Sequence, residues 1–533
     1  MSTTSPPSSS PTPQRAWQSL CPNCGAPVGF ASAASASAVC GYCQSTLLRE
    51  GDALRRIGRC AELFDDHTPL QLGVQGRYQN VPFTLIGRLQ YRYDGGTWNE
   101  WFALFEPSDA PPRPAWLSED NGAYVFAFDQ PAPSEPLRLA DLQPGTDCTV
   151  GRRVWSVASI TSVRLHAAQG ELPRPPRLDT TFLVADLRND AGEVGTLDGA
   201  DPDAPLWSVG RSVRLDDLAL SGLREGAAEQ TLGARSLSCP SCGSDLAPKL
   251  DSTRSLTCPS CHAVVDISQG AGADLAYFAQ SNAGPGGQAS EPLIPLGRTG
   301  TLALDGPALP WQVVGYMERC DLPEPGDDEP QTFWREYLLY HRTQGFAFLV
   351  DTEEGWSWVR PLTGAPKVAG KRAAWQSRRY QERWRYRAKV TWVLGEFYWR
   401  VEREDIAHVT DYSGPTGWQL SREQSGTEVV WSEGRNLGTE DVRKAFNLPA
   451  GKLPTPSRST FGLGRWITWL LILLPLFLLV RACSNDECQA VSDGFGPNSA
   501  EYQKCKNQRV VTPSYLGSGG SFGGFSSGGG GHK

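Results

Sequence analysis

Short apolar runs separated by glycine-rich turns predict a chain built mainly of β-strands. Residues 346–350 and 356–359 are two such runs joined by a turn near Glu354-Gly355, which is typical of a β-hairpin. Residues 81–93 and 98–105 form a second pair around a short polar turn. Strands at this spacing indicate a β-sandwich or a small barrel.

A third hairpin and one short helix complete the expected elements. The apolar residues 390–394 and 397–401 flank Gly395-Glu396, which reads as another turn. Few segments have the pattern of a helix. Thr439-Glu440-Asp441 predicts the N-terminal cap of one short helix that runs through Phe446.

Length and composition agree with a strand-rich, multi-domain protein. The 533 residues exceed what one hydrophobic core supports, so two or three folded units are expected. The chain has 18 Trp, 56 Gly and 41 Pro but only 2 Met, which favours strands and turns over a helical bundle. A net charge of −8 argues against a generally cationic nucleic-acid binder.

Eight of the 14 cysteines form two matching sets. In each set, two CxxC pairs are separated by fifteen residues, and two such knuckles complete a tetrahedral four-sulfur shell for zinc. The expected ligands are Cys21, Cys24, Cys40 and Cys43 in the first set and Cys239, Cys242, Cys258 and Cys261 in the second. Four cysteine ligands leave no open coordination position, so two structural zinc ions are predicted.

Competing interpretations of the cysteines fit less well. Disulfides would require an oxidising compartment, and a redox CxxC normally accompanies a βαβ pattern that is absent around these pairs. Gly25 and Gly243 follow the second ligand of each first knuckle, where a tight turn favours a residue tolerant of positive φ. His262 adjoins Cys261 and is expected at the surface, outside the metal shell. No Lys or Arg lies between Cys21 and Cys43, which disfavours nucleic-acid binding by the first ribbon.

Each four-cysteine ribbon is the first part of a longer segment that occurs twice in the chain. Five segments of the first half recur in the second at offsets between 223 and 236 residues. They include Trp98-Asn99-Glu100-Trp101 with Trp334-Arg335-Glu336-Tyr337, Gly170-Glu171-Leu172 with Gly395-Glu396-Phe397, and Trp207-Ser208-Val209-Gly210-Arg211 with Trp431-Ser432-Glu433-Gly434-Arg435. The chain therefore reads as ribbon, module, ribbon, module.

This order resembles a bacterial domain-of-unknown-function family that pairs a four-cysteine zinc ribbon with a tryptophan-rich β module, singly or duplicated and sometimes followed by a membrane helix. The resemblance covers roughly residues 17–450. It implies no catalytic residues, because the family has no established activity. It implies an accessory role in membrane-associated or envelope-stress systems.

Residues 461–482 are expected to form one transmembrane helix. The run 466–480 is strongly apolar, and extension through residue 461 with Arg465 at the interface reaches the length needed to span a bilayer. Lys452, Arg458 and Arg465 precede the span, whereas Arg481 alone follows it closely. The positive-inside rule then puts the N-terminal bulk in the cytoplasm and residues 483–533 outside.

The predicted organisation follows from these features. Residues 1–16 are a Ser/Pro-rich disordered leader, and residues 483–533 are a Gly/Ser-rich tail in which Cys488 and Cys505 could form a disulfide, with Cys483 at the membrane boundary. The remaining parts are zinc ribbon 1 at 17–50, β module 1 at 51–222, zinc ribbon 2 at 235–268, a linker at 269–288, β module 2 at 289–448 and a second linker at 449–460.

Several polar groups outside the ribbons are candidate sites. Asp65-Asp66-His67 could supply metal ligands but has no counterpart in the second module, so a loop is the preferred interpretation. Glu100 and Glu336 occupy equivalent places in aromatic strands, where a neighbouring Arg or backbone group is expected to satisfy each carboxylate. Arg211 and Arg435 end a shared motif and are expected in stacking or ion pairs. Cys60, Cys148 and Cys320 are expected as buried or free thiols.

Residues 375–400 are rich in arginine and aromatic residues. Interleaving of this kind can bind single-stranded nucleic acid or anionic lipid, but a strand with one apolar and one solvated face produces the same pattern.

No convincing catalytic constellation emerges, so we expect a membrane-anchored, non-enzymatic binding or scaffold protein. Its partners are expected to be membrane-associated proteins and, through residues 461–482, the bilayer. Two alternatives remain open. One is an enzyme with a cleft site in the β modules that uses Glu100 and Glu336, and the other is a nucleic-acid or anionic-lipid binder.

Overall fold

The computed structural model describes residues 17–449 apart from 33–34, 51–52, 61–67, 95, 108–109, 121–122, 132–136, 178–179, 202–203, 225–236, 251–252, 269–274, 279, 281–291, 305, 324–330, 342–343 and 402–403. Within this part of the chain, no helix has the length and apolar character needed to cross a membrane. The predicted leader, the predicted membrane span at 461–482 and the tail with Cys483, Cys488 and Cys505 lie outside the described residues, as does Asp65-Asp66-His67.

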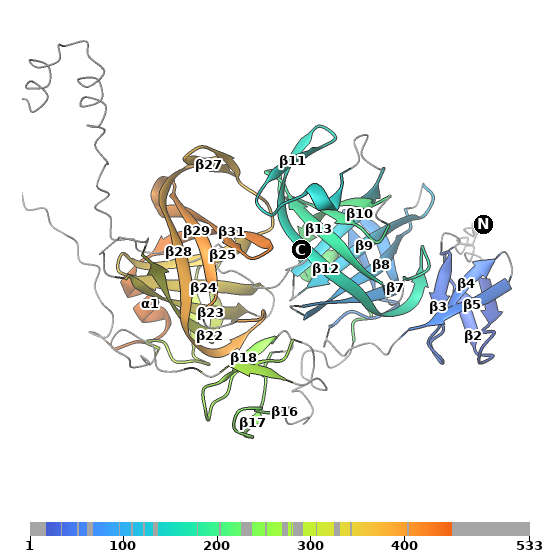
Figure 1. Cartoon of the computed structure of the whole chain (residues 1–533), viewed down its shortest axis with the longest axis horizontal. Helices are drawn as coiled ribbons and strands as arrows, with labels where there is room; N and C mark the ends of the chain where they lie inside the picture. Colours follow the sequence, from blue (N-terminus) through green and yellow to red (C-terminus); the bar gives the residue numbers. More distant parts are fainter. Residues whose placement is uncertain are drawn as a thin grey trace, which may run out of the picture. The chain divides into compact units, whose positions relative to one another are not determined.

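The first β module is a closed antiparallel barrel of eight strands (Figure 1). Its strands are β7 (Val81–Tyr93), β8 (Gly96–Phe105), β9 (Arg113–Asp120), β10 (Ala123–Gln130), β12 (Arg153–Leu172), β13 (Thr181–Arg188), β14 (Glu193–Asp198) and β15 (Leu206–Val213). They pair in the order β7-β8-β9-β10-β15-β14-β13-β12, and β12 returns to β7 to close the barrel. The module is therefore two four-stranded meanders joined edge to edge.

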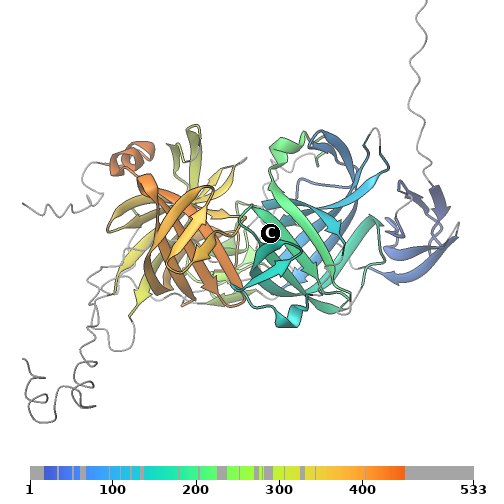
Figure 2. The same cartoon turned by 90° about the horizontal axis from the view of Figure 1, so that it is seen from above.

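The second module repeats this topology strand for strand. Its strands are β22 (Leu309–Leu322), β23 (Phe333–His341), β24 (Gly345–Thr352), β25 (Gly355–Leu362), β28 (Arg378–Phe397), β29 (Ile406–Ser413), β30 (Trp418–Ser425) and β31 (Glu428–Leu437). They pair in the order β22-β23-β24-β25-β31-β30-β29-β28, and β28 closes on β22. Figure 2 shows the strands of both barrels from a second direction. The duplication seen in the sequence is thus a duplication of the barrel.

Shorter elements flank the barrels. They are β6 (Gln75–Tyr78), β11 (Asp147–Val150), η1 (Leu139–Asp141) and η2 (Leu215–Leu218) around the first barrel, and β21 (Thr299–Leu302), β26 (Lys367–Ala369), β27 (Arg372–Trp375), η3 (Pro415–Gly417) and α1 (Thr439–Ala445) around the second. Val442 of α1 and Phe446 pack against Trp311 and Val313 on the outer face of the second barrel. The short helix is therefore a cover for an apolar outer face.

Each barrel is preceded by a small ribbon of short strands. Ribbon 1 contains β1 (Trp17–Leu20), β2 (Pro27–Phe30), β3 (Ser37–Val39), β4 (Ser45–Glu50) and β5 (Ala53–Arg59). Ribbon 2 contains β16 (Leu237–Ser238), β17 (Asp245–Leu246), β18 (Ser255–Thr257), β19 (Val264–Asp266) and β20 (Ala276–Phe278). β20 pairs with β19, so part of the range expected as a linker at 269–288 is a strand of the ribbon.

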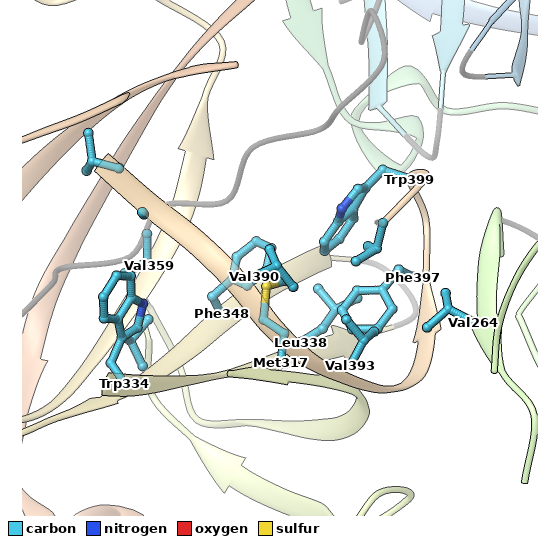
Figure 3. Close-up of a cluster of buried hydrophobic side chains, with 14 residues drawn as sticks. Val264, Met317, Trp334, Leu338, Phe348, Val359, Val390, Val393, Phe397 and Trp399 are labelled. Carbon is cyan, nitrogen blue, oxygen red and sulfur yellow. The ribbon is translucent and has the colours of Figure 1, made fainter. Parts of the chain in front are cut away.

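The interior of the second barrel is filled by side chains. A cluster drawn from the barrel strands, joined by Val264 of ribbon 2, includes Met317, Trp334, Phe348 and Val359, all buried (Figure 3). Eight-stranded barrels have an interior just wide enough for side chains to fill. The core of this module therefore occupies the space in which some other eight-stranded barrels hold a small ligand.

The structure confirms two of the three expected hairpins and corrects the third. β7–β8 and β24–β25 are hairpins, whereas residues 378–397 form the single strand β28 without a turn at Gly395-Glu396. Gly395 has a φ of 87°, and a Cβ there would lie 2.3 Å from the Val314 carbonyl oxygen. Glycine is needed at this point because two strands cross closely. The helix after residue 438 is present, but its N-cap is Gly438 and it has no side-chain cap.

Candidate metal centres

Ribbon 1 brings its four predicted cysteines to one point. The first CxxC lies between β1 and β2, and the second lies between β3 and β4. Cys21 Sγ lies 3.7 Å from Cys43 Sγ, and Cys24 Sγ lies 3.7 Å from Cys40 Sγ. All four sulfur atoms lie within 4.8 Å of one another.

Ribbon 2 has the same arrangement. Cys239 Sγ lies 3.7 Å from Cys261 Sγ, and Cys242 Sγ lies 3.7 Å from Cys258 Sγ. These four atoms also lie within 4.8 Å of one another. In both ribbons the first and third cysteines are buried. They pack against the apolar core of the ribbon, which fixes the position of each site.

The sulfur geometry fits a four-coordinate zinc-type ion. A zinc–sulfur bond of about 2.3 Å in a regular tetrahedron separates neighbouring sulfur atoms by about 3.8 Å. The sulfur pairs of both ribbons are 3.7 Å apart. Two four-cysteine centres that could hold zinc-type ions are thus present, and thiolate is the donor that such ions favour.

All four knuckles are closed by the same backbone turn. The N–H of the residue after the second cysteine donates to the carbonyl of the first, as Gly25 does to Cys21 at 2.8 Å. Gly25 and Gly243 have φ of 74° and 76°, which confirms the turn expected at these glycines. Gln44 and His262 adopt the same conformation, with φ of 58° and 59°, at the second knuckles. His262 is exposed, and the four-cysteine group in ribbon 2 does not include it.

Serine residues near the cysteines favour the thiolate form. Ser45 Oγ lies 3.2 Å from Cys43 Sγ, and Ser244 Oγ lies 3.3 Å from Cys242 Sγ. Hydrogen bonding with Ser45, together with Asn23, lowers the pKa of Cys43 to about 5. Hydrogen bonding with the side chain and backbone of Ser244 lowers the pKa of Cys242 to about 6. Burial raises the pKa of Cys239 in the same cluster to about 11, and the pKa of Cys24 in ribbon 1 is raised as well. The serine contacts thus favour one thiolate, the form that binds metal, in each ribbon.

The ribbons are joined to the barrels by a shared strand pairing. β3 of ribbon 1 pairs with the last residues of β12, with Val39 opposite Gly170 and Ser37 opposite Leu172. β18 of ribbon 2 pairs with the last residues of β28, with Ser255 opposite Phe397. The same end of the same barrel strand therefore receives the ribbon in both copies.

A buried glutamate strengthens this joint in each copy. Glu171, only 7% exposed, accepts hydrogen bonds from the backbone N–H groups of Ala31 and Ser32 and from Ser35 Oγ at 2.7 Å. Glu396, only 9% exposed, accepts from the backbone N–H groups of Lys249 and Leu250 at 2.9 and 3.1 Å and from Thr253 Oγ1 at 2.7 Å. We name these two contact sets the glutamate clamps.

The sequence shows the repeated Gly-Glu pair, but its pattern predicts a hairpin turn at Gly395-Glu396 and no contact for either glutamate. The usable signal was the recurrence of a charged residue within an otherwise apolar strand end at a duplicated position. Its partners lie 136–147 residues away along the chain, so no local pattern reveals the clamp.

The equivalent glutamates Glu100 and Glu336 have different surroundings. Glu336 is 1% exposed and accepts from Trp334 Nε1 at 2.8 Å and from Arg319 at 3.4 Å. Glu100 is half-buried and is close to the hydroxyl of Ser118, which donates to it. The expected arginine is present beside Glu336, but it reaches Oε1 only, and Oε2 of Glu336 is buried without a hydrogen-bond partner among the residues that the structure describes. The serine hydroxyl that contacts Glu100 is neither the arginine nor the backbone group that the sequence led us to expect.

The other predicted candidates are in ordinary structural roles. Arg211 forms an ion pair with Glu193 at 3.0 Å, and Arg435 lies over the Trp418 ring at 5.8 Å, as expected. Cys60 and Cys320 are buried thiols, and Cys148 is a half-buried one.

Most of the arginine-rich residues 375–400 lie in strand β28, which has acidic neighbours. Arg383 stacks on Trp384 at 3.8 Å and pairs with Glu354 at 2.6 Å. Lys389 pairs with Glu404 at 2.9 Å. Carboxylates already neutralise these cations. The contacts therefore favour the interpretation as a strand with one solvated face over the interpretation as a phosphate-binding surface.

The fold and the sites define a protein made of two repeated units, each a four-cysteine ribbon joined to an eight-stranded barrel. The model of the family described as Domain of unknown function (DUF4178) matches residues 71–215 and 304–439. The chain belongs to this family, with two copies of the domain. Comparison with curated proteins gives no match, and comparison with solved structures gives none. The matched ranges fall on the barrels, and both four-cysteine groups lie outside them.

Proposed function

We propose that this protein is a non-enzymatic scaffold whose two zinc-stapled barrel units recruit partner proteins at the cytoplasmic face of a membrane. The observation that carries the proposal is the duplicated unit itself, in which a closed four-sulfur centre and a packed barrel are joined in the same way twice. Each ion would be structural, because four cysteine ligands leave no position for water or substrate.

The interior of the second barrel is packed with side chains, which favours partner binding on the outer surface over catalysis inside the barrel. The second barrel is filled by a buried apolar cluster, and Glu336 lies among those side chains, in contact with Arg319 and Trp334. A general acid or base must reach its substrate within hydrogen-bond distance. A glutamate with 1% exposure inside a packed barrel is poorly placed for that task.

Two linked copies suit a partner that is itself repeated or oligomeric. Once one unit has bound, the second binds at a high effective concentration, which raises the overall affinity without any new contact. The membrane tether in this proposal is the apolar segment 461–482, with the ribbons on the cytoplasmic side, where four-cysteine centres stay reduced. The partners are membrane-associated proteins.

A crosslinking pull-down from native membranes tests the proposal. The intact chain should recover membrane-remodelling or stress proteins, and a Cys21→Ser, Cys24→Ser variant should recover less of them. A Cys148→Ser variant is the matched control, because this half-buried thiol is no part of either sulfur cluster. Recovery unaffected by ribbon loss, together with a turnover that Glu100→Gln and Glu336→Gln abolish, would replace the scaffold with an enzyme.

A further inference from the structure

The two glutamate clamps act on the segment that connects the metal-binding knuckles, which we call the knuckle loop. In ribbon 1 it runs from Cys24 to Cys40 through β2 and β3, and Glu171 accepts hydrogen bonds from three groups between these strands. In ribbon 2 it runs from Cys242 to Cys258, and Glu396 again accepts from three. In both copies, two successive backbone N–H groups and one hydroxyl converge on a single buried carboxylate. Carboxylate acceptors make short, strong hydrogen bonds to such donors.

The position of each glutamate is determined by its barrel. The preceding residues Gly170 and Gly395 have φ of 71° and 87°, and a Cβ at either one would lie 2.3 Å from a carbonyl oxygen of the neighbouring strand, that of Ile86 or Val314. The strand adopts this positive-φ conformation at the glycine only because no side chain is present there. The carboxylate that follows is directed to the ribbon by this close crossing within the barrel.

The clamp and the metal centre constrain the same loop. An ion bound to both knuckles ties the two ends of the loop together, and the carboxylate holds its middle against the barrel. Each constraint lowers the conformational entropy that the other must overcome. By linkage, a group that stabilises the metal-binding conformation raises metal affinity, and metal binding in turn stabilises the joint.

From this arrangement we propose that Glu171 and Glu396 are positioning residues that couple metal binding in each ribbon to the barrel that follows it. The inference rests on the proposed zinc occupancy of the four-cysteine centres. Metal removal should loosen the knuckle loop and the β3–β12 or β18–β28 pairing, and loss of the carboxylate should weaken metal binding. The strand pairing between ribbon and barrel is then well ordered when metal is bound and less ordered when metal is removed.

The duplication supplies a matched control for the experiment. Full-length chain, purified in detergent, is loaded with Zn²⁺ and titrated with a competing chromophoric chelator. A background with Cys239→Ser and Cys242→Ser reports on ribbon 1 alone, and one with Cys21→Ser and Cys24→Ser reports on ribbon 2 alone. Glu171→Gln should lower the zinc affinity of ribbon 1 about 5-fold or more, the lower end of the range for two coupled sites in one protein. It should leave ribbon 2 unchanged, and Glu396→Gln should show the reverse.

Hydrogen exchange separates coupling from simple misfolding. In Glu171→Gln, protection of residues 35–39 should fall while the barrel strands β8 and β9 stay protected. Glu50→Gln is the surface control, since its exposed ion pair with Arg55 lies on the same ribbon, and it should match the parent chain.

Three outcomes overturn the proposal. In the first, zinc affinity in Glu171→Gln stays within twofold of the parent. In the second, both ribbons weaken equally, which indicates general destabilisation. In the third, the parent chain binds no thiolate-coordinated metal, as judged by Co²⁺ absorption. That result rejects the zinc centres themselves and is distinguishable from the first two.

Discussion

Arg319 of β22 forms an ion pair with Glu423 of β30 across the interior of the second barrel, although these strands are not neighbours in the sheet. Arg319 Nη1 lies 3.3 Å from Glu423 Oε2 and 3.4 Å from Glu336 Oε1, and all three side chains are almost fully buried. One guanidinium thus serves two carboxylates. In the first barrel, Tyr91 occupies the position of Arg319, since both residues lie opposite the first tryptophan of the repeated strand motif.

Replacement of Arg319 should strongly destabilise the second barrel. Arg319→Met removes the cation and leaves two buried carboxylates next to each other, and breaking a buried pair in this way costs about 3–5 kcal/mol. Urea unfolding of the full-length chain measures the loss. Arg383→Met is the control, because its pair with Glu354 is exposed and should contribute about 1 kcal/mol or less. Equal losses in the two variants would contradict the interior role of Arg319.

The same cluster should make stability depend on pH. Burial raises the pKa of Glu423 to about 7, the Arg319 charge opposes the shift, and Glu336 adds to it. The folded state therefore holds this proton more tightly than the unfolded state, in which a glutamate titrates near about 4.3. The contribution of Glu423 is fully present below about pH 4.3 and is lost as the pH rises through about 7.

Glu423→Gln should remove this part of the pH dependence. The melting temperatures of the parent and the variant are compared from pH 4 to 8. As the pH rises, the melting temperature of the parent should fall relative to that of the variant. A difference that does not change with pH would show that the pKa of Glu423 is the same in the folded and unfolded states.

Replacement of Gly170 should destabilise the first barrel, both because its φ is positive and because a Cβ there would collide with the neighbouring strand. Gly151 has a φ of 64° with open space around its Cβ position, so Gly151→Ala should cost about 1–2 kcal/mol from backbone strain. Gly170→Ala adds a collision with the Ile86 carbonyl oxygen and should cost at least about 3 kcal/mol. Thermal unfolding of the two variants compares them directly. If they lose the same stability, the close crossing of β7 and β12 does not constrain the chain.

Metal content should be two zinc ions per chain. Metal analysis of protein expressed in zinc-replete medium should give this ratio, and Cys→Ser changes in one ribbon should reduce it to one. Chelation should release the ribbons before the barrels, because the barrels have their own apolar cores. One ion or fewer in the parent chain would mean that a cysteine set has another role.

Thiol labelling tests the proposed membrane topology. An impermeant reagent, applied to intact cells after mild reduction, should reach Cys488 and Cys505 but not the ribbon cysteines, because the tail is expected outside. Labelling of the ribbons with protection of the tail would invert the topology and favour disulfides in place of metal.

The features predicted from sequence are those that depend on residues close together in the chain. The CxxC pairs, their positive-φ turns and the β7–β8 and β24–β25 hairpins each lie within a short segment, where residue type alone restricts the conformation. The duplication was also readable, because equivalent segments recur at nearly constant offset.

Tertiary structure decided the features that join distant segments. Barrel closure depends on the pairing of β12 with β7 and of β28 with β22, and hydrophobic alternation along one strand does not specify which other strand it meets. For the same reason Gly395 looked like a turn, although it marks the place where β28 crosses the strand that carries Val314. The ion pair between Arg319 and Glu423 spans 104 residues, and the contact of Glu171 with Ser35 spans 136. These carboxylates acquired their roles only when folding buried them beside donors that the local sequence does not contain.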